Sequence, residues 1–356
     1  MNKDFYAVIM AGGIGSRFWP MSTVDHPKQF MDILGTGRTL IQQTYDRFLG
    51  ICPKENILVV TNERYKEMVL YQLEGMQENQ VLCEPIMRNT ATAIAYAAFK
   101  IREQNPNAKM VVAPSDHIIL KEEKFQQIIL SALQIAEANK GLLTLGITPT
   151  RPDTGYGYIQ FLKNEISPKE SLLRKVKRFT EKPDLENAVK FINSGDFVWN
   201  AGIFVWSLDS ILDAFKRFIP DLYSIFDAGK GVLNTSKEEA FIQEEFPKCP
   251  NISIDYGVME NADNVYTMIS DIGWSDLGTW GSLFDISPKD KNNNALVNGN
   301  IHAFESSDNM IHVPDDRQIV IQGLHDFIVV EDDRTILICA KKDEQKIKGI
   351  VQKLTK

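Results

Sequence analysis

Apolar residues in the first 270 or so positions gather into short runs of Val, Ile and Leu, separated by stretches with helical spacing. The runs Phe5–Met10, Ile57–Thr61, Met110–Ala113 and Leu142–Gly146 are the predicted strands. They show little alternation of apolar and polar positions, which is typical of strands buried on both faces of a parallel sheet.

Between these runs, apolar residues recur every three or four positions, which predicts amphipathic helices around residues 40–49, 94–101 and 125–136. Strands that alternate with helices indicate βαβ units. The predicted fold class is therefore α/β, with a Rossmann-like mixed, mainly parallel sheet.

The pattern changes after Ser287. The polar run Lys289–Asn294 predicts a loop, and the positions after it form short β-like pieces separated by Asn, Asp and Gly. These pieces are Ala295–Val297, Ile311–Val313, Ile319–Ile321, Phe327–Val330 and Thr335–Cys339. An amphipathic helix, Asp343–Lys353, is predicted last. We expect two domains, a large one over residues 1–285 and a small β-rich one over residues 286–356 that ends in a helix.

Charge and composition narrow the possible partners. The 356 residues carry 39 Lys and Arg against 47 Asp and Glu, a net charge of −8. This acidic balance argues against binding to nucleic acid, which requires a basic face. It leaves small anionic substrates open, because the charge of a pocket is set locally.

The cysteines and the apolar segments indicate the cellular compartment in which we expect the protein. The four cysteines lie far apart without a C-x-x-C pair, so we expect neither a zinc cluster nor a disulfide framework. No stretch approaches the roughly 18 apolar residues of a membrane span, and the apolar run near the N-terminus is too short for a signal peptide. These features predict a cytoplasmic protein that does not bind membranes.

A glycine-rich segment, Ala11-Gly12-Gly13-Ile-Gly15-Ser-Arg17, directly follows the first predicted strand. Glycines let backbone N–H groups approach a phosphate closely. The spacing fits neither the dinucleotide fingerprint nor the P-loop, but the guanidinium of Arg17 suits phosphate oxygens. The alternative is a tight turn that ends in a surface arginine.

The segment that follows favours the phosphate interpretation. Pro27 biases His26 away from helix, which would hold Lys28 on a defined loop near the glycines. The strings Met10–Ser22 and Pro27–Phe30 together resemble the signature of the sugar-nucleotide pyrophosphorylases, a nucleotidyltransferase family, and most closely its mannose-1-phosphate guanylyltransferase branch. The resemblance implies that Ala11, Gly12, Gly13, Gly15 and Arg17 bind the nucleotide, with Arg17 and Lys28 also catalytic.

Two aspartates are candidate metal ligands. Asp116 follows the strand Met110–Ala113, where open α/β sheets bind ligands, although a lone Asp there more often caps a helix. Asp276 lies in a segment rich in glycine and tryptophan, Gly273–Trp280, and by itself could be a turn residue. By resemblance, Asp116 and Asp276 jointly hold the metal, which we expect to be Mg²⁺.

Three strings between these aspartates resemble the family's site for a sugar 1-phosphate. They contain Gly157, the pair Glu181-Lys182 and Asn200; alone, Glu181-Lys182 is more simply a solvated charge pair. The resemblance implies that Glu181 and Asn200 bind sugar hydroxyls, Gly157 makes a backbone contact, and Lys182 is a catalytic residue that binds the sugar phosphate. Asp255 is a further sugar-site candidate, unless it caps a short helix.

The segment Glu84–Ala91 corresponds to the part of the family that faces the nucleobase, which implies Glu84, Asn89 and Thr90 as nucleotide-binding residues. The alternative is that Thr90 simply caps the helix that follows. The matches keep their order from Ala7 to Trp280. The tail resembles the left-handed β-helix-like C-terminal domain of short members that lack a fused isomerase domain, and a homodimer is expected.

The resemblance implies a nucleotide-diphospho-sugar transferase fold and a reaction that makes GDP-mannose and pyrophosphate from GTP and mannose 1-phosphate. Three alternatives remain open: a transferase for glucose 1-phosphate with UTP or dTTP, a glycosyltransferase that consumes a nucleotide sugar, and a non-catalytic sensor of GDP-mannose. Pyrophosphate release with different triphosphates separates these alternatives.

Overall fold

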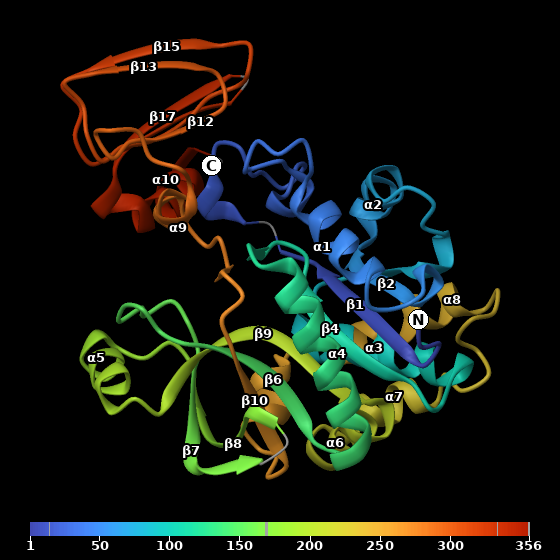
Figure 1. Ribbon diagram of the computed structural model, residues 1–356. Coiled ribbons are helices and arrows are strands. Elements are labelled where there is room, and N and C mark those ends of the chain that lie inside the picture. Colours follow the sequence, from blue (N-terminus) through green and yellow to red (C-terminus); the bar gives the residue numbers. More distant parts are fainter. Residues whose placement is uncertain (14, 168–169, 333, 355–356) are drawn as a thin grey trace. The chain divides into compact units, whose positions relative to one another are not determined.

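The computed structural model describes residues 1–13, 15–167, 170–332 and 334–354 (Figure 1). The chain divides into two compact units. The first unit contains Met1–Gly12, Tyr45–Ser115 and Ile119–Trp274, and the second contains Gly13–Thr44, Asp116–Ile118 and Ser275–Lys356. The second unit is thus assembled from three separate pieces of the sequence.

The first unit contains a sheet of nine described strands in the order β3-β2-β1-β4-β9-β6-β10-β8-β7. Its neighbours are parallel from β3 to β4 and between β6 and β10, whereas β9 runs antiparallel to β4 and β6. The predicted α/β class with a mixed, mainly parallel sheet is confirmed. The strands are β1 (Phe5–Ala11), β2 (Ile57–Asn62), β3 (Val81–Glu84), β4 (Lys109–Pro114), β6 (Leu142–Ile147), β7 (Tyr158–Ser167), β8 (Glu170–Thr180), β9 (Phe197–Ser207) and β10 (Val265–Ser270).

Helices cover both faces of this sheet (Figure 1). Tyr6 and Val8 of β1 share a buried core with α3, α6 and α7, whereas α4 packs on β4 and β9, where Phe125 contacts Phe48 of α1. The three predicted helices are confirmed as α1, α3 and α4. The helices are α1 (Leu40–Leu49), α2 (Lys66–Gln72), α3 (Asn89–Gln104), α4 (Glu122–Asn139), α5 (Leu185–Ser194), α6 (Leu208–Phe218), α7 (Pro220–Asp227) and α8 (Glu238–Glu245).

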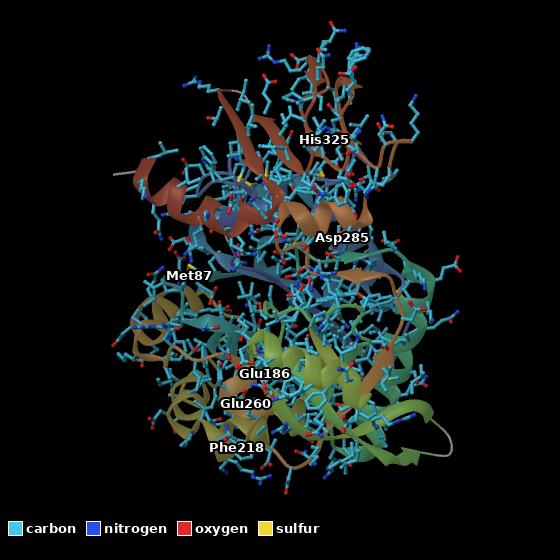
Figure 2. All side chains as sticks on the ribbon, turned by 90° about the vertical axis from the view of Figure 1, so that its left-hand side faces the viewer. Met87, Glu186, Phe218, Glu260, Asp285 and His325 are labelled. Carbon is cyan, nitrogen blue, oxygen red and sulfur yellow. The ribbon has the colours of Figure 1, made fainter. Side chains whose placement is uncertain are left out.

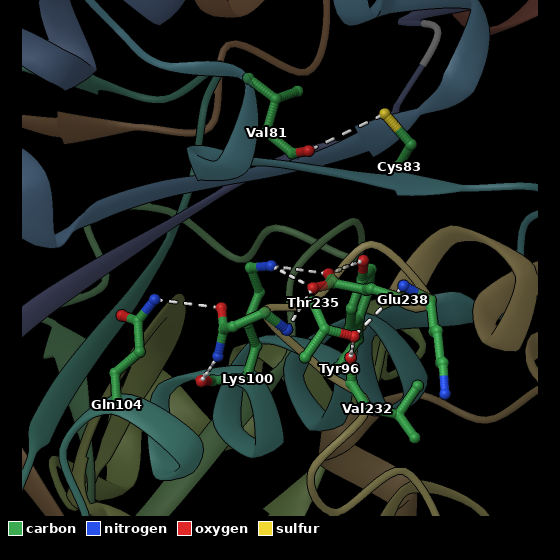
Figure 3. A network of polar contacts seen from close by, with 10 residues as sticks. Val81, Cys83, Tyr96, Lys100, Gln104, Val232, Thr235 and Glu238 are labelled. Carbon is green, nitrogen blue, oxygen red and sulfur yellow. Dashed lines mark hydrogen bonds and ion pairs between the residues drawn. The ribbon is translucent and has the colours of Figure 1, made fainter.

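A partly buried polar network attaches α8 to α3 (Figure 3). Lys100 Nζ lies 2.5 Å from Glu238 Oε2, and the Tyr96 hydroxyl donates to Glu238 Oε1 at 2.6 Å. Asn234 Nδ2 donates to the backbone oxygen of Lys100 at 2.9 Å. Because these polar groups satisfy one another, the network specifies where the segment after α7 returns to the sheet.

The second unit contains the β-rich tail. Strands β12 (Ala295–Val297), β14 (Met310–His312) and β16 (Phe327–Asp332) stack in parallel, with β17 (Thr335–Ala340) antiparallel to β16. A second parallel pair is formed by β13 (Asn300–Phe304) and β15 (Gln318–Gln322). Buried Asn294 and Asn309 repeat one position in successive coils, with Asn309 Nδ2 donating to Asn294 Oδ1 at 2.9 Å. The predicted β-helix-like tail is confirmed.

The chain then reaches the C-terminal helices of this unit. A core containing Phe18, Trp280 and Ile347 joins the segment after β1 to α9 (Trp280–Ile286) and α10 (Ile347–Leu354). The prediction of one helix over Asp343–Lys353 is wrong in its first part, because Lys341–Lys346 is a 3-10 helix. There, Glu344 accepts a hydrogen bond from the backbone N–H of Gly281 at 2.8 Å, so a tertiary contact constrains this segment.

Two short strands, β5 (Ile118–Ile119) and β11 (Trp274–Ser275), form a small sheet of their own. Across the described part of the chain, no helix combines the length and apolar character needed to cross a membrane. The four cysteines are free thiols, and burial raises the pKa of Cys52 and Cys249 to about 12.

Candidate functional site

The second unit contains a cavity of about 290 Å³ beside the glycine-rich segment, which we call the glycine-turn pocket. The three pieces of this unit all contribute to its lining. The lining residues are Gly15, Ser16, Arg17, Phe18, Lys28, Asp116, His117, Asp276, Leu277, Gly278 and Lys348. The structure thus brings together the predicted residues Gly15, Arg17, Lys28, Asp116 and Asp276.

Lys28 lies at the centre of the contacts in this pocket. Its side chain is only 3% exposed, and its ammonium lies 2.9 Å from Asp116 Oδ2. The same ammonium donates to the backbone oxygens of Asp276 at 3.1 Å and Leu277 at 2.8 Å. Since an ammonium has three N–H donors, these protein acceptors are enough to occupy all of them. Lys28 therefore links the two segments that bear the candidate metal ligands.

Asp116 is held in its ionised form by its neighbours. Burial opposes ionisation, but the charges of Lys28 and His117 lower the pKa of this carboxyl below its ordinary value. Its side chain remains 29% exposed. The helix-cap alternative is wrong, because Asp116 is followed by the strand β5 and the next helix, α4, begins at Glu122.

Asp276 occupies a turn, and its Oδ1 accepts a hydrogen bond from the backbone N–H of Gly278 at 3.0 Å. Two carboxylates lining one pocket suit a hard divalent cation, and Mg²⁺ takes one or two carboxylates and completes its shell with water or phosphate oxygens. Within the described residues no group of three or more His, Cys, Asp or Glu side chains could hold a metal. The two carboxylates alone leave the rest of the coordination shell of such a cation to water or phosphate oxygens.

The three glycines of the turn differ in what they require. Gly15 has φ +69°, and a Cβ there would lie 2.6 Å from the Lys28 Cβ, so both backbone conformation and packing exclude a side chain. At Gly12, a Cβ would meet Glu84 Oε2 at 3.6 Å, an ordinary contact. A Cβ at Gly13 would meet nothing within 4 Å. Protein packing therefore explains Gly15, whereas Gly13 leaves its backbone open to a ligand.

We predict opposite phenotypes for two substitutions in this turn. Gly15→Ala lowers the melting temperature, because the new methyl group collides with Lys28 in a strained backbone conformation. Gly13→Ala leaves the melting temperature unchanged but weakens binding of inorganic tripolyphosphate by about tenfold, because the methyl group blocks close approach to the backbone. Thermal denaturation and calorimetric titration measure the two effects. A Gly13→Ala protein with unchanged affinity would contradict the assignment.

Arg17 lies on a short 3-10 turn, Ser16–Phe18, whose backbone is anchored by the neighbouring side chain. Phe18 is 1% exposed, and its ring lies 4.8 Å from that of Trp280. The Arg17 side chain itself is exposed and makes no ion pair with the described residues. The backbone of Arg17 is therefore fixed while its guanidinium is not paired with these residues, which suits the binding of an anionic ligand.

The first unit brings together the predicted sugar-binding residues, which we call the amide–carboxylate site: Gly157, Glu181, Asn200 and Asp255. A Cβ at Gly157 would lie 2.6 Å from Glu181 Oε2, and the backbone N–H of Asn200 donates to the Gly157 oxygen at 2.8 Å. Asn200 Nδ2 donates to Asp255 Oδ1 at 2.8 Å. Neighbouring amide and carboxylate groups form a surface suited to binding a polyol.

The electrostatics of this site centre on Asp255. Burial, reinforced by the negative charge of Glu181, raises the pKa of Asp255 to about 6, although the hydrogen bond from Asn200 opposes the shift. Asp255 is the first residue of a short π-helix, Asp255–Met259, and the residue at the N-cap position is Ile254. The alternative role as a helix cap is therefore wrong.

Lys182 is placed differently from the other predicted sugar-site residues. Its side chain is 61% exposed and pairs with the Glu181 carboxylate, as the solvated-pair alternative describes. Its backbone has φ +41°, an uncommon conformation for a residue with a side chain. The charge is adjacent to the amide–carboxylate site, and its contact with a substrate phosphate stays a prediction.

The predicted nucleobase segment follows β3. Burial raises the pKa of Glu84 to about 8. Met87, labelled in Figure 2, is 57% exposed. The Thr90 cap is wrong: α3 begins at Asn89, and Thr90 Oγ1 accepts a hydrogen bond from the backbone N–H of Ile254 at 2.8 Å. This bond ties the segment to the chain that carries Asp255.

Sequence reasoning missed two contributors to these sites. Thr144 of β6 donates to Asn200 Oδ1 at 3.1 Å and so orients its amide. Lys348 of α10 lines the glycine-turn pocket. A buried threonine is common in strands, and a lysine on an amphipathic helix is expected to face solvent, so neither position carries a signal in the sequence.

Comparisons with known proteins agree with this arrangement. Residues 6–293 match the Nucleotidyl transferase family model, and residues 300–354 match that of the MannoseP isomerase/GMP-like beta-helix domain. Mannose-1-phosphate guanylyltransferase RfbM of Salmonella typhimurium is 37% identical over 99% of this chain and 72% of its own length. A mannose-1-phosphate guanylyltransferase of Escherichia coli K12 is 34% identical over 99% of this chain and 74% of its own length.

A solved structure agrees over nearly the whole chain. It is described as a mannose-1-phosphate geranyltransferase from Thermus thermophilus, and it matches with a TM-score of 0.87 and 28% identity over 99% of this chain and all of its own. The family models, the relatives and the fold all agree with the family resemblance that the sequence motifs indicate. The chain belongs to the mannose-1-phosphate guanylyltransferase family of nucleotidyl transferases.

Proposed function

We propose that this chain makes GDP-mannose and pyrophosphate from GTP and mannose 1-phosphate. The observation that carries the proposal is the glycine-turn pocket, in which Arg17 and Lys28 accompany Asp116 and Asp276. The relatives named as mannose-1-phosphate guanylyltransferases support the choice of base and sugar. An oxygen of the sugar phosphate attacks the α-phosphorus of GTP, the bond from that phosphorus to the β-phosphate oxygen breaks, and pyrophosphate leaves with the electron pair.

The glycine-turn pocket is assigned to the triphosphate. Backbone N–H groups of the turn and the guanidinium of Arg17 bind the β- and γ-phosphates, and Lys28 keeps the carboxylates of Asp116 and Asp276 in place. These carboxylates are assigned to a divalent metal, which we propose to be Mg²⁺; when bound, it neutralises negative charge on the phosphates. The reaction needs no covalent intermediate, because positioning and charge neutralisation supply most of the rate enhancement.

The amide–carboxylate site is assigned to mannose 1-phosphate. Glu181, Asn200 and Asp255 bind the sugar hydroxyls, and Gly157 lets the backbone approach the ring. Lys182 neutralises the sugar phosphate, so that one anion can attack another. The ammonium leaves Glu181 for the phosphate at little cost, because an exposed ion pair contributes only about 0–1 kcal/mol.

The segment containing Glu84, Asn89 and Thr90 is assigned to the nucleobase. Guanine presents N–H groups that can donate hydrogen bonds to a carboxylate. Since burial raises the pKa of Glu84 to about 8, binding of guanine to an ionised Glu84 releases a proton at neutral pH. Thr90, already bonded to Ile254, holds the shape of this segment.

We predict the fastest pyrophosphate release with GTP and mannose 1-phosphate in a matrix of four nucleoside triphosphates against several sugar 1-phosphates. Coupled detection of pyrophosphate measures each pair. A highest kcat/KM with UTP or dTTP and glucose 1-phosphate would replace the guanylyl assignment. Tight GDP-mannose binding without turnover for any pair, at saturating Mg²⁺, would instead support a sensor.

A second prediction concerns the charges of the glycine-turn pocket. Arg17→Ala and Asp276→Ala each lower kcat by at least about 100-fold, because each removes a preorganised charge from the transition state. Asp276→Asn is the matched control for structure, since its amide oxygen still accepts from Gly278, and it also loses activity. Circular dichroism checks folding. Near wild-type turnover in Arg17→Ala or Asp276→Ala would refute the assignment of that residue.

A third prediction concerns pH. The pKa of Asp255 is raised to about 6, so the carboxylate is ionised above this pH. Below it, one oxygen carries a proton and the group accepts from sugar hydroxyls less well. The KM for mannose 1-phosphate therefore rises as pH falls from 7 to 5, approaching tenfold per pH unit below the pKa. Asp255→Asn raises the KM at pH 7 and removes this part of the dependence.

The Asp255→Asn variant also serves as the control, because the substrate's own phosphate titrates near pH 6. Whatever pH dependence the variant retains belongs to the substrate, and the difference between the two profiles belongs to Asp255. Parallel profiles would contradict a role for the carboxylate.

We further propose that the chain acts as a homodimer in the cytoplasm. Exposed Ile336 and Ile338 share one face of β17, and Phe304 and Val320 are exposed on β13 and β15. Exposed apolar side chains on a small β-helix-like tail are typical of a surface that is covered by another subunit. The four free thiols fit a reducing compartment.

A further inference from the structure

We propose that Lys348 of the C-terminal helix α10 binds the polyphosphate of the substrate and the pyrophosphate product. The identity of the nucleotide rests on the proposed function. That Lys348 binds an anion rests on the geometry of the pocket. Lys348 lines the glycine-turn pocket together with Arg17, Lys28 and the two aspartates. It is the one lining residue contributed by α10 among those described.

The position of Lys348 is set by its buried neighbours. Ile347, the preceding residue, is fully buried in the core that contains Phe18, and Val351 packs against the same core one turn later. As a result α10 packs on the 3-10 turn Ser16–Phe18 that carries Arg17 (Figure 1). The backbone of Lys348 is therefore held beside the glycine turn, while its long side chain stays exposed.

A second contact fixes the segment before α10. Gly281 of α9 donates its backbone N–H to Glu344 Oε2 at 2.8 Å, and a Cβ at Gly281 would lie 3.0 Å from that oxygen. Trp280, next to Gly281, packs on Phe18. The start of the tail helix is thus attached to the same residues that anchor the glycine turn.

Charge explains why a cation is useful at this place. The pocket contains Arg17, Lys28 and Lys348 against Asp116 and Asp276, an excess of one positive charge. Lys28 is engaged with Asp116 and two backbone oxygens, whereas Lys348 makes no ion pair with the described residues. Without Lys348, these side-chain charges sum to zero. Lys348 therefore supplies the excess positive charge for a ligand that carries three or four negative charges.

The test compares Lys348→Met with Lys353→Met in the full chain. Methionine keeps the apolar stem and removes the charge, and Lys353 is an exposed lysine of the same helix that does not line the pocket. We expect Lys348→Met to weaken binding of inorganic tripolyphosphate, measured by calorimetry, by about tenfold. Lys348→Arg retains most of the affinity, and Lys353→Met behaves as wild type.

Kinetics give the second readout. In the reverse reaction with GDP-mannose, Lys348→Met raises the KM for pyrophosphate by a similar factor while the KM for mannose 1-phosphate in the forward reaction stays within about twofold. Equal affinities for tripolyphosphate in the two methionine variants, with both proteins folded, would overturn the proposal. Weakened tripolyphosphate binding in a protein that turns over no nucleotide would uphold Lys348 as an anion ligand and refute the proposed function alone.

Discussion

The buried ammonium of Lys28 is the contact on which the glycine-turn pocket depends. It lies between the carboxylate of Asp116 and the backbone oxygens of Asp276 and Leu277, residues that are about 90 and 250 positions away in the sequence. Two carboxylates lining one small cavity repel each other unless a cation lies nearby. Lys28 supplies that cation, and its burial makes removal costly, because a buried charge left without its partner is strongly destabilising. The same contact that shapes the pocket keeps Asp116 ionised.

Around this contact, the remaining parts of the pocket have separate tasks. Gly15 allows the turn to pass close to Lys28, and Phe18 anchors the turn to Trp280. Arg17 lies between them with its side chain exposed. Rigid groups therefore surround one exposed cation, an arrangement that lets an anion bind without reorganising the backbone. In the first unit, Asn200 holds the groups of the amide–carboxylate site together. It donates to Asp255 and Gly157 and accepts from Thr144.

The sequence predicted the central strands and helices because their apolar periodicity is strong and local. It also predicted the neighbourhood of Gly15, Arg17 and Lys28, since a glycine turn and a proline restrict the backbone nearby. Only family resemblance pairs Asp116 with Asp276, because nothing local distinguishes them from a helix cap or a turn. The cap predicted at Thr90 and the first part of the helix predicted over Asp343–Lys353 are wrong, because long-range hydrogen bonds from Ile254 and Gly281 override local preference. Lys348 has no local signature at all.

The acidic composition and the anionic chemistry are compatible for a physical reason. Electrostatic interactions between exposed charges fade over about 8–10 Å at physiological ionic strength, so a net charge of −8 spread over 356 residues has little effect inside one small cavity. The local charge of the cavity is instead set by its own lining, which contains three cations and two carboxylates. Two of those cations, Arg17 and Lys28, come from the start of the chain and the third comes from α10, so the β-helix-like tail and the nucleotidyl transferase part of the chain contribute charge to one pocket. On this argument the tail has a part in binding substrate that is separate from any part in assembly.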